Sequence, residues 1–301
     1  MKTFGALTKR NIKIFFKDKG MFFTSLITPI ILLILYATFL AKVYRDSFAA
    51  ALPEGLVVSE KLINGTVGGE LFSSLLAVSC ITVAFCSNLL MVNDKISGAR
   101  KDFLISPVKK STLAFSYFFG TLTSTLIVSF VATIACFVYI AITGWYFTFG
   151  NIMLVLLDVI ILTMFGTALS SVVNIFLSTT GQASAVGTIV SAGYGFICGA
   201  YMPISSFGSG LQKIISLLPG TYGTSLIRNH ALADVFVAMQ NEGFPPEVVE
   251  GIKDSIDCNL YFFGTPVSQG VMFGIMIGSI ALFVGLFVLI NFLKSKKAAK
   301  N

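Results

Sequence analysis

The sequence predicts an all-α protein that crosses a membrane several times. Of its 301 residues, 55% are hydrophobic and only 12% are charged, whereas a soluble domain carries about 25% charged residues. A helix needs about 20 apolar residues to span a bilayer. Six runs meet that length: residues 21–41, 71–92, 113–142, 152–177, 183–202 and 267–292. Because lipid offers the backbone no hydrogen-bond partner, we expect six transmembrane helices.

A basic amphipathic segment precedes the first apolar run. When residues 2–19 are drawn as a helix, the basic side chains gather on one arc and the apolar side chains lie outside it. The basic set is Lys2, Lys9, Arg10, Lys13 and Lys17. A signal that only sets topology would not need this segregation, which is typical of a helix lying in the membrane interface. We therefore expect residues 1–20 to form an interfacial helix.

A short charged loop, residues 93–112, separates the second and third runs. Gly98 and Pro107 limit any helix within it to about two turns. Phe103, Leu104 and Val108 provide an apolar edge that fits a groove on a partner protein. The alternative is a solvated loop whose lysines only set the topology, but such a loop has no need of apolar side chains.

The connection between the fifth and sixth runs, residues 203–266, falls into two parts. Residues 203–233 are too apolar for an ordinary loop and too interrupted by Pro and Gly for a span. We expect short helices there, among them residues 211–218, that enter the outer leaflet and return. Residues 240–260 are acidic, and we expect them to be exposed, with a helix starting at Pro246.

The charges also predict the orientation of the spans. Residues 1–20, 93–112 and 293–301 together carry 15 Lys and Arg against 3 Asp and Glu. In residues 42–70 and 203–266 the balance is reversed, with 6 basic and 10 acidic residues. By the positive-inside rule, the first group and hence both termini are expected in the cytoplasm.

Several functional classes are disfavoured by the sequence. None of the 27 glycines precedes a lysine, so the phosphate-binding loop of P-loop nucleotidases is absent. The five cysteines have no metal-ligand spacing, and His230 is the single histidine, so no metal site is expected. No catalytic constellation is present. The basic residues flank apolar runs, which fits lipid headgroups rather than nucleic acid.

Small residues recur along the sixth run, at Gly270, Gly274, Gly278 and Gly285. Small side chains at helical spacing let two membrane helices approach closely. We therefore expect this side of the sixth helix to pack against another helix.

Two motifs resemble the type-2 ABC exporter permease family. Asp94, Lys95 and Gly98 are similar to the start of its acid–base–x–x–Gly … Leu–x–x–Pro–Val pattern, although the family usually has Glu-Arg at the first two positions. The pattern continues here at Leu104, Pro107 and Val108. The second motif, similar to the family's Gly–x–x–x–Pro … Leu–Pro … Arg run, comprises Gly199, Pro203, Pro219 and Arg228. The resemblance extends over residues 4–292.

The resemblance implies a single permease domain, residues 1–301, that pairs with a second copy or a homologue in a bacterial cell membrane. Two separate ATPase subunits would bind ATP and Mg, and this chain would bind no cofactor. The coupling contacts would be Asp94, Lys95, Gly98, Phe103, Leu104, Pro107 and Val108. Pro203, Pro219 and Arg228 would belong to the re-entrant segment.

By the same resemblance, the second and fifth spans line the substrate path. The candidates are Ser87, Ser184, Thr188 and Ser191, with Tyr194 and Phe196 as gates. Hydrogen bonding between helices is the alternative role for the hydroxyl groups. Asp158, an acid within the fourth run, either lines the path or is a structural acid bonded to a neighbouring helix.

The expected cargo is a hydrophobic drug or an antimicrobial peptide, because the path holds no charge apart from Asp158. The acidic segment 234–257 offers a place to receive a cationic peptide. A lipid-linked glycan is the competing cargo. A secondary transporter needs repeats or ion ligands inside the membrane, which we do not find, and a non-transporting membrane component is the third class.

Overall fold

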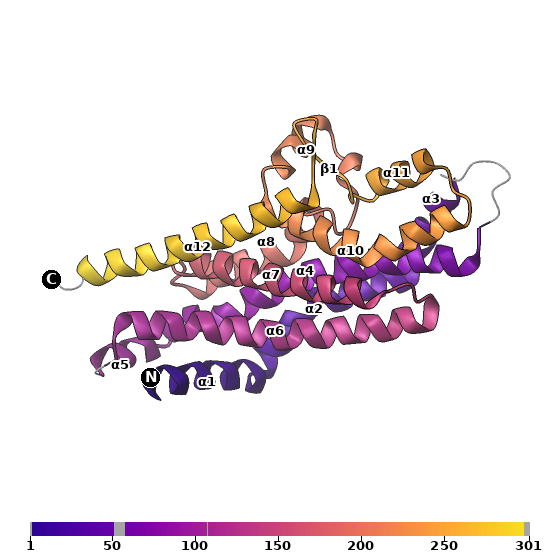
Figure 1. The fold of residues 1–301 in the computed structure, drawn as a ribbon. Coiled ribbons are helices and arrows are strands. Elements are labelled where there is room, and N and C mark those ends of the chain that lie inside the picture. The colour runs from indigo at the N-terminus through magenta and orange to yellow at the C-terminus, as the bar shows by residue number, and fades with distance from the viewer. Residues whose placement is uncertain (1, 51–57, 107, 298–301) are drawn as a thin grey trace.

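One helix, α4 (Glu60–Ile96), runs through the middle of an elongated helical bundle (Figure 1). The computed structural model describes residues 2–50, 58–106 and 108–297. Within them, α4, α6 (Lys110–Thr143), α7 (Phe149–Asn174) and α12 (Gln269–Lys297) are long and apolar enough to cross a membrane. The expected class, an all-α polytopic membrane protein, is confirmed.

The first apolar run lies beyond a sharp bend. α1 (Lys2–Lys17) meets α2 (Lys19–Leu35) at 69°, and the side chain of Asp18 caps α2 by accepting a hydrogen bond from Met21 N at 3.0 Å. An N-cap of this kind starts a new helix. α2 continues through a π-helical turn (Tyr36–Leu40) into α3 (Ala41–Ala50). If α1 and α2 are counted as one span, five spans are found among the described residues.

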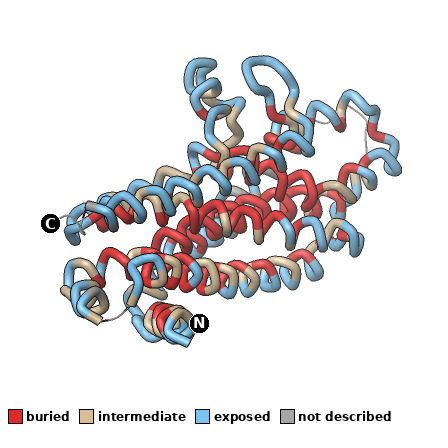
Figure 2. The backbone as a smooth tube through the Cα atoms, turned by 60° about the vertical axis from the view of Figure 1, so that its left-hand side comes forward, coloured by how far each residue is buried: buried red, intermediate tan, exposed pale blue. Residues whose placement is uncertain are grey.

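α4 is the core of the bundle, and 94% of the residues in its most apolar 18-residue stretch are buried. Its neighbours are α2, α6, α7, α8 (Thr180–Ile197) and α10 (Pro219–Asn241), and Figure 2 shows the buried residues concentrated along this axis. The helix begins 11 residues before the expected span, because the Ser59 hydroxyl caps it by accepting from Leu62 N. This extension packs against α10, where Gly69 lies directly on Leu232.

The fifth run forms α8, which ends at Ile197, five residues before the expected end of the run. Gly199 follows with a φ of 73°, a left-handed conformation that favours glycine. With 18 residues, α8 is not among the described helices that meet the length and apolarity of a span. The number of six spans therefore stays a prediction.

The connection to the sixth run is more helical than expected. A short 3-10 turn (Ile204–Ser206) and α9 (Ser209–Ile215) lead to α10, and α11 (Pro246–Ser255) begins at the expected proline. Pro219 follows α9 and also occupies the first turn of α10. At that position its missing N–H removes no hydrogen bond from the helix. Most of α10 is buried against α4, α7 and α12.

The acidic part, residues 240–260, is only partly exposed, since Val249 and Ile252 of α11 are buried. A hairpin of β1 (Leu260–Phe262) and β2 (Thr265–Val267) follows, with Tyr261 opposite Pro266. The sequence pattern of these residues does not predict the hairpin. It brings the chain to the start of α12.

The expected packing of small residues in α12 is wrong within this chain. Among the described residues, no atom beyond the adjacent residues and the local backbone of α12 lies within 4 Å of the Cβ position at Gly270, Gly274, Gly278 or Gly285. The close helix contact is made instead by Gly166 of α7, whose Cβ would lie 3.0 Å from the carbonyl oxygen of Cys80 and 2.9 Å from Ile81 Cδ1. The α4–α7 interface therefore has no room for a methyl group at this position.

The substitution Gly166→Ala tests that interface. We expect the free energy of unfolding to fall by about 1–3 kcal/mol, because the added methyl group forces the two backbones apart. Gly278→Ala is the matched control and should change stability by less than about 1 kcal/mol, since its methyl group meets open space. Thermal unfolding in detergent measures both, and equal stability of the two variants would contradict the packing.

Candidate functional site

The best-defined polar contact at the end of the bundle that holds α1 is an ion pair between Arg10 and Asp94. Arg10 Nη1 lies 2.5 Å from Asp94 Oδ2, and Arg10 Nη2 donates to Asp94 Oδ1 at 2.9 Å. The hydroxyl of Tyr117 on α6 donates to Asp94 Oδ2 at 2.6 Å. A two-pronged guanidinium–carboxylate contact fixes geometry as well as charge. We call Arg10, Asp94 and Tyr117 the Asp94 junction.

The junction is partly shielded from solvent. The Asp94 side chain is 7% exposed and that of Arg10 is 29% exposed. The hydrogen bond and charge of Asp94 raise the pKa of Arg10 above its ordinary value, so the guanidinium stays charged. Its other face lies over the ring of Phe103, 5.1 Å from the centroid, which adds a cation–π contact. The ion pair thus connects α1 to the end of α4, and the hydrogen bond from Tyr117 adds α6.

The neighbouring residue, Lys95, points to a different helix. Its ammonium group donates to the carbonyl oxygens of Asn174, Ile175 and Leu177 at 3.1, 2.9 and 2.8 Å. These carbonyls close the C-terminal end of α7, where a helix carries partial negative charge. Lys294 of α12 also reaches Ile175 O at 3.1 Å. Asp94 and Lys95 therefore do not form a pair with each other, but join α4 to different neighbours.

Gly98 ends α4 and begins α5 (Ala99–Ile105), with a φ of 88°. The resulting two-turn helix is the length expected for the coupling loop. Phe103 and Val108 are half-buried against the core, whereas Ile105 is 86% exposed. Pro107 and the side chain of Leu104 lie outside the described residues.

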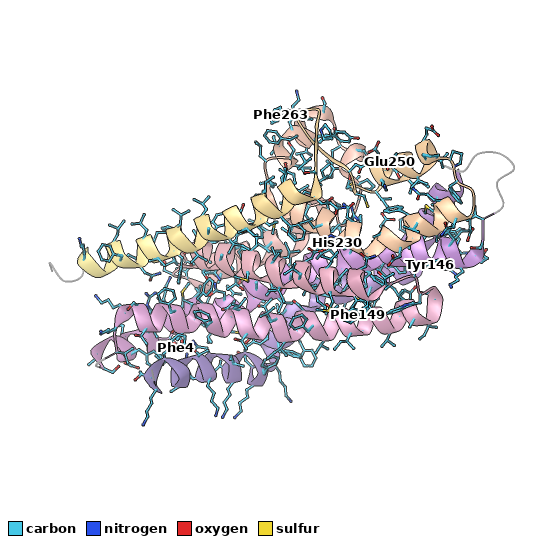
Figure 3. The ribbon with its side chains drawn as sticks, viewed as in Figure 1. Phe4, Tyr146, Phe149, His230, Glu250 and Phe263 are labelled. Carbon is cyan, nitrogen blue, oxygen red and sulfur yellow. The ribbon has the colours of Figure 1, made fainter. Side chains whose placement is uncertain are left out.

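The amphipathic leader is a helix, as expected. Leu7, Asn11 and Phe15 face the bundle and are buried, and α1 packs along α6, where Asn11 closely contacts Gly120. The four lysines of the basic arc are exposed. Figure 3 shows nitrogen-tipped side chains extending from α1 away from the bundle. Arg10 differs from them because it turns inward to Asp94.

A second polar cluster centres on Arg228 of α10, which is buried. Its guanidinium donates to Ser74 Oγ at 3.1 Å, to Gly199 O at 2.8 Å and to Ile256 O at 2.6 Å. It also lies 3.6 Å from the carboxylate of Asp257. Buried charges are stable only when they are paired and hydrogen-bonded. Arg228 thereby joins α10 to α4, to the turn after α8 and to the loop after α11.

Asp257 holds the turn after α8. Its carboxylate accepts hydrogen bonds from Ile204 N at 2.9 and 3.1 Å. Burial raises the pKa of Asp257 to about 6, although the charge of Arg228 acts in the opposite direction. Pro203 directly precedes the 3-10 turn and Pro219 starts α10. The three residues assigned to the re-entrant segment thus lie in one connected region.

The candidate path residues do not gather at one place within a single chain. Ser87 is buried in α4. Ser184 and Thr188 are exposed on α8, Ser191 is half-buried, and Phe196 is 50% exposed. The hydroxyl of Tyr194 is buried without a hydrogen-bond partner among the described residues. The structure therefore divides these residues between an enclosed helix and an open face of α8.

Asp158 has a partner on a neighbouring helix. Its Oδ2 lies 2.5 Å from Nδ1 of His230 on α10, and both side chains are buried. Its Oδ1 has no hydrogen-bond partner among the described residues. The geometry matches the alternative of a structural acid bonded to an adjacent helix.

Three residues important to these sites were not identified from sequence. Arg10 belongs to the same basic arc of residues 2–19 as the four lysines. Only its position at the edge of that arc, on the side towards α6, distinguishes it from them. Ile105 occupies a variable position of the loop motif. His230 has no sequence signal, because its partner Asp158 lies 72 residues away in the chain.

Comparison with known proteins gives a family match over most of the chain. Residues 2–231 match a family model described as "ABC-2 type transporter". No curated protein matches the chain in sequence. The matched range contains the Asp94 junction, α5, α8 and Arg228, and it ends within α10.

Replacing Asp94 by Asn tests the junction. The free energy of unfolding should fall by about 1.5–3 kcal/mol, because charged hydrogen bonds from Arg10 and Tyr117 are lost. Asp102→Asn, on the exposed side of α5, is the matched control and should change it by less than about 0.5 kcal/mol. Chemical denaturation in detergent measures both variants.

A double-mutant cycle with Arg10→Gln and Asp94→Asn measures the interaction between these two side chains separately from their other contacts. We expect a coupling free energy of at least about 1 kcal/mol, because the two residues are in contact. Strict additivity of the two substitutions would contradict the junction.

Proposed function

Because this chain belongs to the ABC-2 type transporter family, we propose that it exports a hydrophobic or amphipathic molecule from a bacterial cell. The chain is a multi-pass membrane permease of an ABC transporter, and it works with ABC ATPase partners. Two ATPase subunits, carrying ATP and Mg, would act on two permease copies. The basic ends of the permease would face the cytoplasm, as their charge favours.

The ATPase contact is proposed to lie on α5. Ile105 is 86% exposed, and an apolar side chain held on a two-turn helix fits a groove in a partner. Phe103 does not compete for that groove, because its ring lies beneath the guanidinium of Arg10. Gly98 is the N-cap of α5, and Arg10 of the Asp94 junction lies over Phe103 within it.

The Asp94 junction is the observation that carries this proposal. A displacement of α5 or α1 is transmitted to α4 and α6 through Arg10, Asp94 and Tyr117. Lys95 transmits it to the end of α7 through three carbonyl groups. Charge-assisted hydrogen bonds of this kind move connected helices together rather than independently.

At the other side of the bundle, Arg228 connects α4 to the turn after α8. Movement of α4 would therefore alter the position of α8, whose face with Ser184 and Thr188 is open in one chain. We place the substrate path on this face, opposite the same helix of a second copy. Phe196 and Tyr194, near the turn, would act as gates.

The proposed cargo follows from the lack of charge on this face. Along α8, Thr180–Ile197, no residue is charged, and a charged cargo would lack a partner there. A cationic peptide fits only if the acidic segment receives it, and five of its acids are already engaged within the chain. These are Asp234, Glu242, Glu250, Asp254 and Asp257. Glu247 of α11 is the exposed acid to test. A lipid-linked glycan is the competing cargo.

Replacing Ile105 by Ser should disconnect the permease from its ATPase. We expect at least a tenfold loss of ATP-driven transport in proteoliposomes, because the apolar contact is lost while the junction is intact. Ile142→Ser is the matched control: Ile142 is 81% exposed on the far end of α6, and its replacement should leave coupling unchanged. Normal transport by the Ile105→Ser variant would refute the proposed contact.

Replacing Thr188 by Trp should block the path. In the reconstituted complex, a hydrophobic dye and a cationic amphipathic peptide should each raise ATP hydrolysis. The substitution should abolish that stimulation and leave the basal rate, because the added ring fills the open face. Ala281→Trp, on the exposed side of α12, is the control. Stimulation by a lipid-linked oligosaccharide alone would favour the competing cargo.

A further inference from the structure

A cavity between the start of α6 and the end of α12 is lined by neither the residues of the Asp94 junction nor Ile105. Its volume is about 520 Å³, and both helix ends lie on the side of the bundle that holds α1 and α5 (Figure 1). Lys109, Lys110 and Phe115 line it on one side, and Phe287, Val288 and Phe292 line it on the other. The cavity therefore combines a basic edge with an apolar wall.

The basic edge is not neutralised within the chain. No acidic residue lines the cavity, and among the described residues neither Lys109 nor Lys110 forms a salt bridge. A third ammonium group, that of Lys296, lies over the ring of Phe292 at 4.8 Å from the centroid. The positive charge at this edge therefore favours binding of an anion from outside the chain.

The apolar wall identifies the kind of anion. Val288 and Phe292 are 42% and 54% exposed although they line the cavity, and Leu289 beside them is also exposed. All three lie within the apolar run that crosses the membrane, close to its end. The rim of the cavity therefore opens sideways to lipid. A free phosphate would use the lysines alone and would leave the apolar wall uncovered.

We propose that this cavity binds one anionic phospholipid. The phosphate contacts Lys109 and Lys110, and an acyl chain lies against Phe115, Phe287 and Val288. Basic pockets between membrane helices at the level of the headgroups recognise lipids by this combination of charge and apolar surface. The bound lipid closes the seam between α6 and α12, where Phe118 and Phe287 already meet with their ring centroids 6.0 Å apart. The site lies apart from the proposed cargo face on α8 and does not include Ile105, although Val108 of the predicted coupling loop also lines the cavity.

The test uses the single tryptophan of the chain, Trp145. A Trp145→Phe, Phe292→Trp variant carries its only indole at the cavity. In vesicles that contain phosphatidylglycerol and phosphatidylcholine, brominated phosphatidylglycerol should quench this indole at least about threefold more strongly than brominated phosphatidylcholine, because two lysines attract the anionic headgroup.

Replacing Lys109 and Lys110 by Gln in this variant should remove the preference. Replacing Lys13 and Lys17 on the exposed side of α1 by Gln, an equal change of charge, should preserve it. Native mass spectrometry of the protein without the tryptophan substitutions should show retained phosphatidylglycerol, which is lost in the Lys109→Gln, Lys110→Gln variant.

Three results would overturn the proposal. Equal quenching by the two lipids, or a preference that survives the removal of both lysines, would show that the cavity does not select an anionic lipid. Displacement of the brominated lipid by millimolar inorganic phosphate would assign the site to a free anion. Loss of quenching when the ATPase partner is added would assign the surface to a protein contact.

Discussion

The enclosure of α4 is the constraint on which the rest of the structure depends. Burying a polar group in an enclosed helix costs free energy unless the group is hydrogen-bonded, and four neighbouring helices supply partners to polar residues of α4. α1 and α6 satisfy Asp94, α7 satisfies Lys95, and α10 donates from Arg228 to Ser74. Asn88, deeper in the helix, donates to Ser170 and Ser171 of α7. These polar residues of α4 thus fix its positions relative to α1, α6, α7 and α10.

The sequence predicted the helical class, the amphipathic leader, the short loop helix and the start of α11, because each is marked by local periodicity, glycine or proline. It did not predict the partners. That Arg10, and not a lysine, meets Asp94 depends on how α1 packs along α6, and the pair of Asp158 with His230 depends on contacts between distant segments. The length of α10 was also missed, since its burial comes from α4, α7 and α12 rather than from its own composition.

Two parts of the chain differ in how firmly they are held. α4, α6 and α7 pack tightly, and glycine at position 166 leaves no space between two of them. α8 contacts α4 on one side and exposes small and hydroxyl-bearing residues on the other. Its attachment at the far end is the turn held by Arg228 and Asp257. This arrangement is suited to relative movement of helices. α4, α6 and α7 can move as one body, while the contacts of α8 rearrange.

The length of α4 has a mechanical consequence. At 1.5 Å per residue, its 37 residues extend over about 55 Å, well beyond the roughly 30 Å of hydrocarbon in a bilayer. A straight rod of this size amplifies rotation: a tilt of about 5° displaces its remote tip by about 5 Å, close to one helical turn. Sub-ångström adjustments around Asp94 are therefore sufficient to reposition Ser59 and its contact with Glu242, with no need for any helix to unwind.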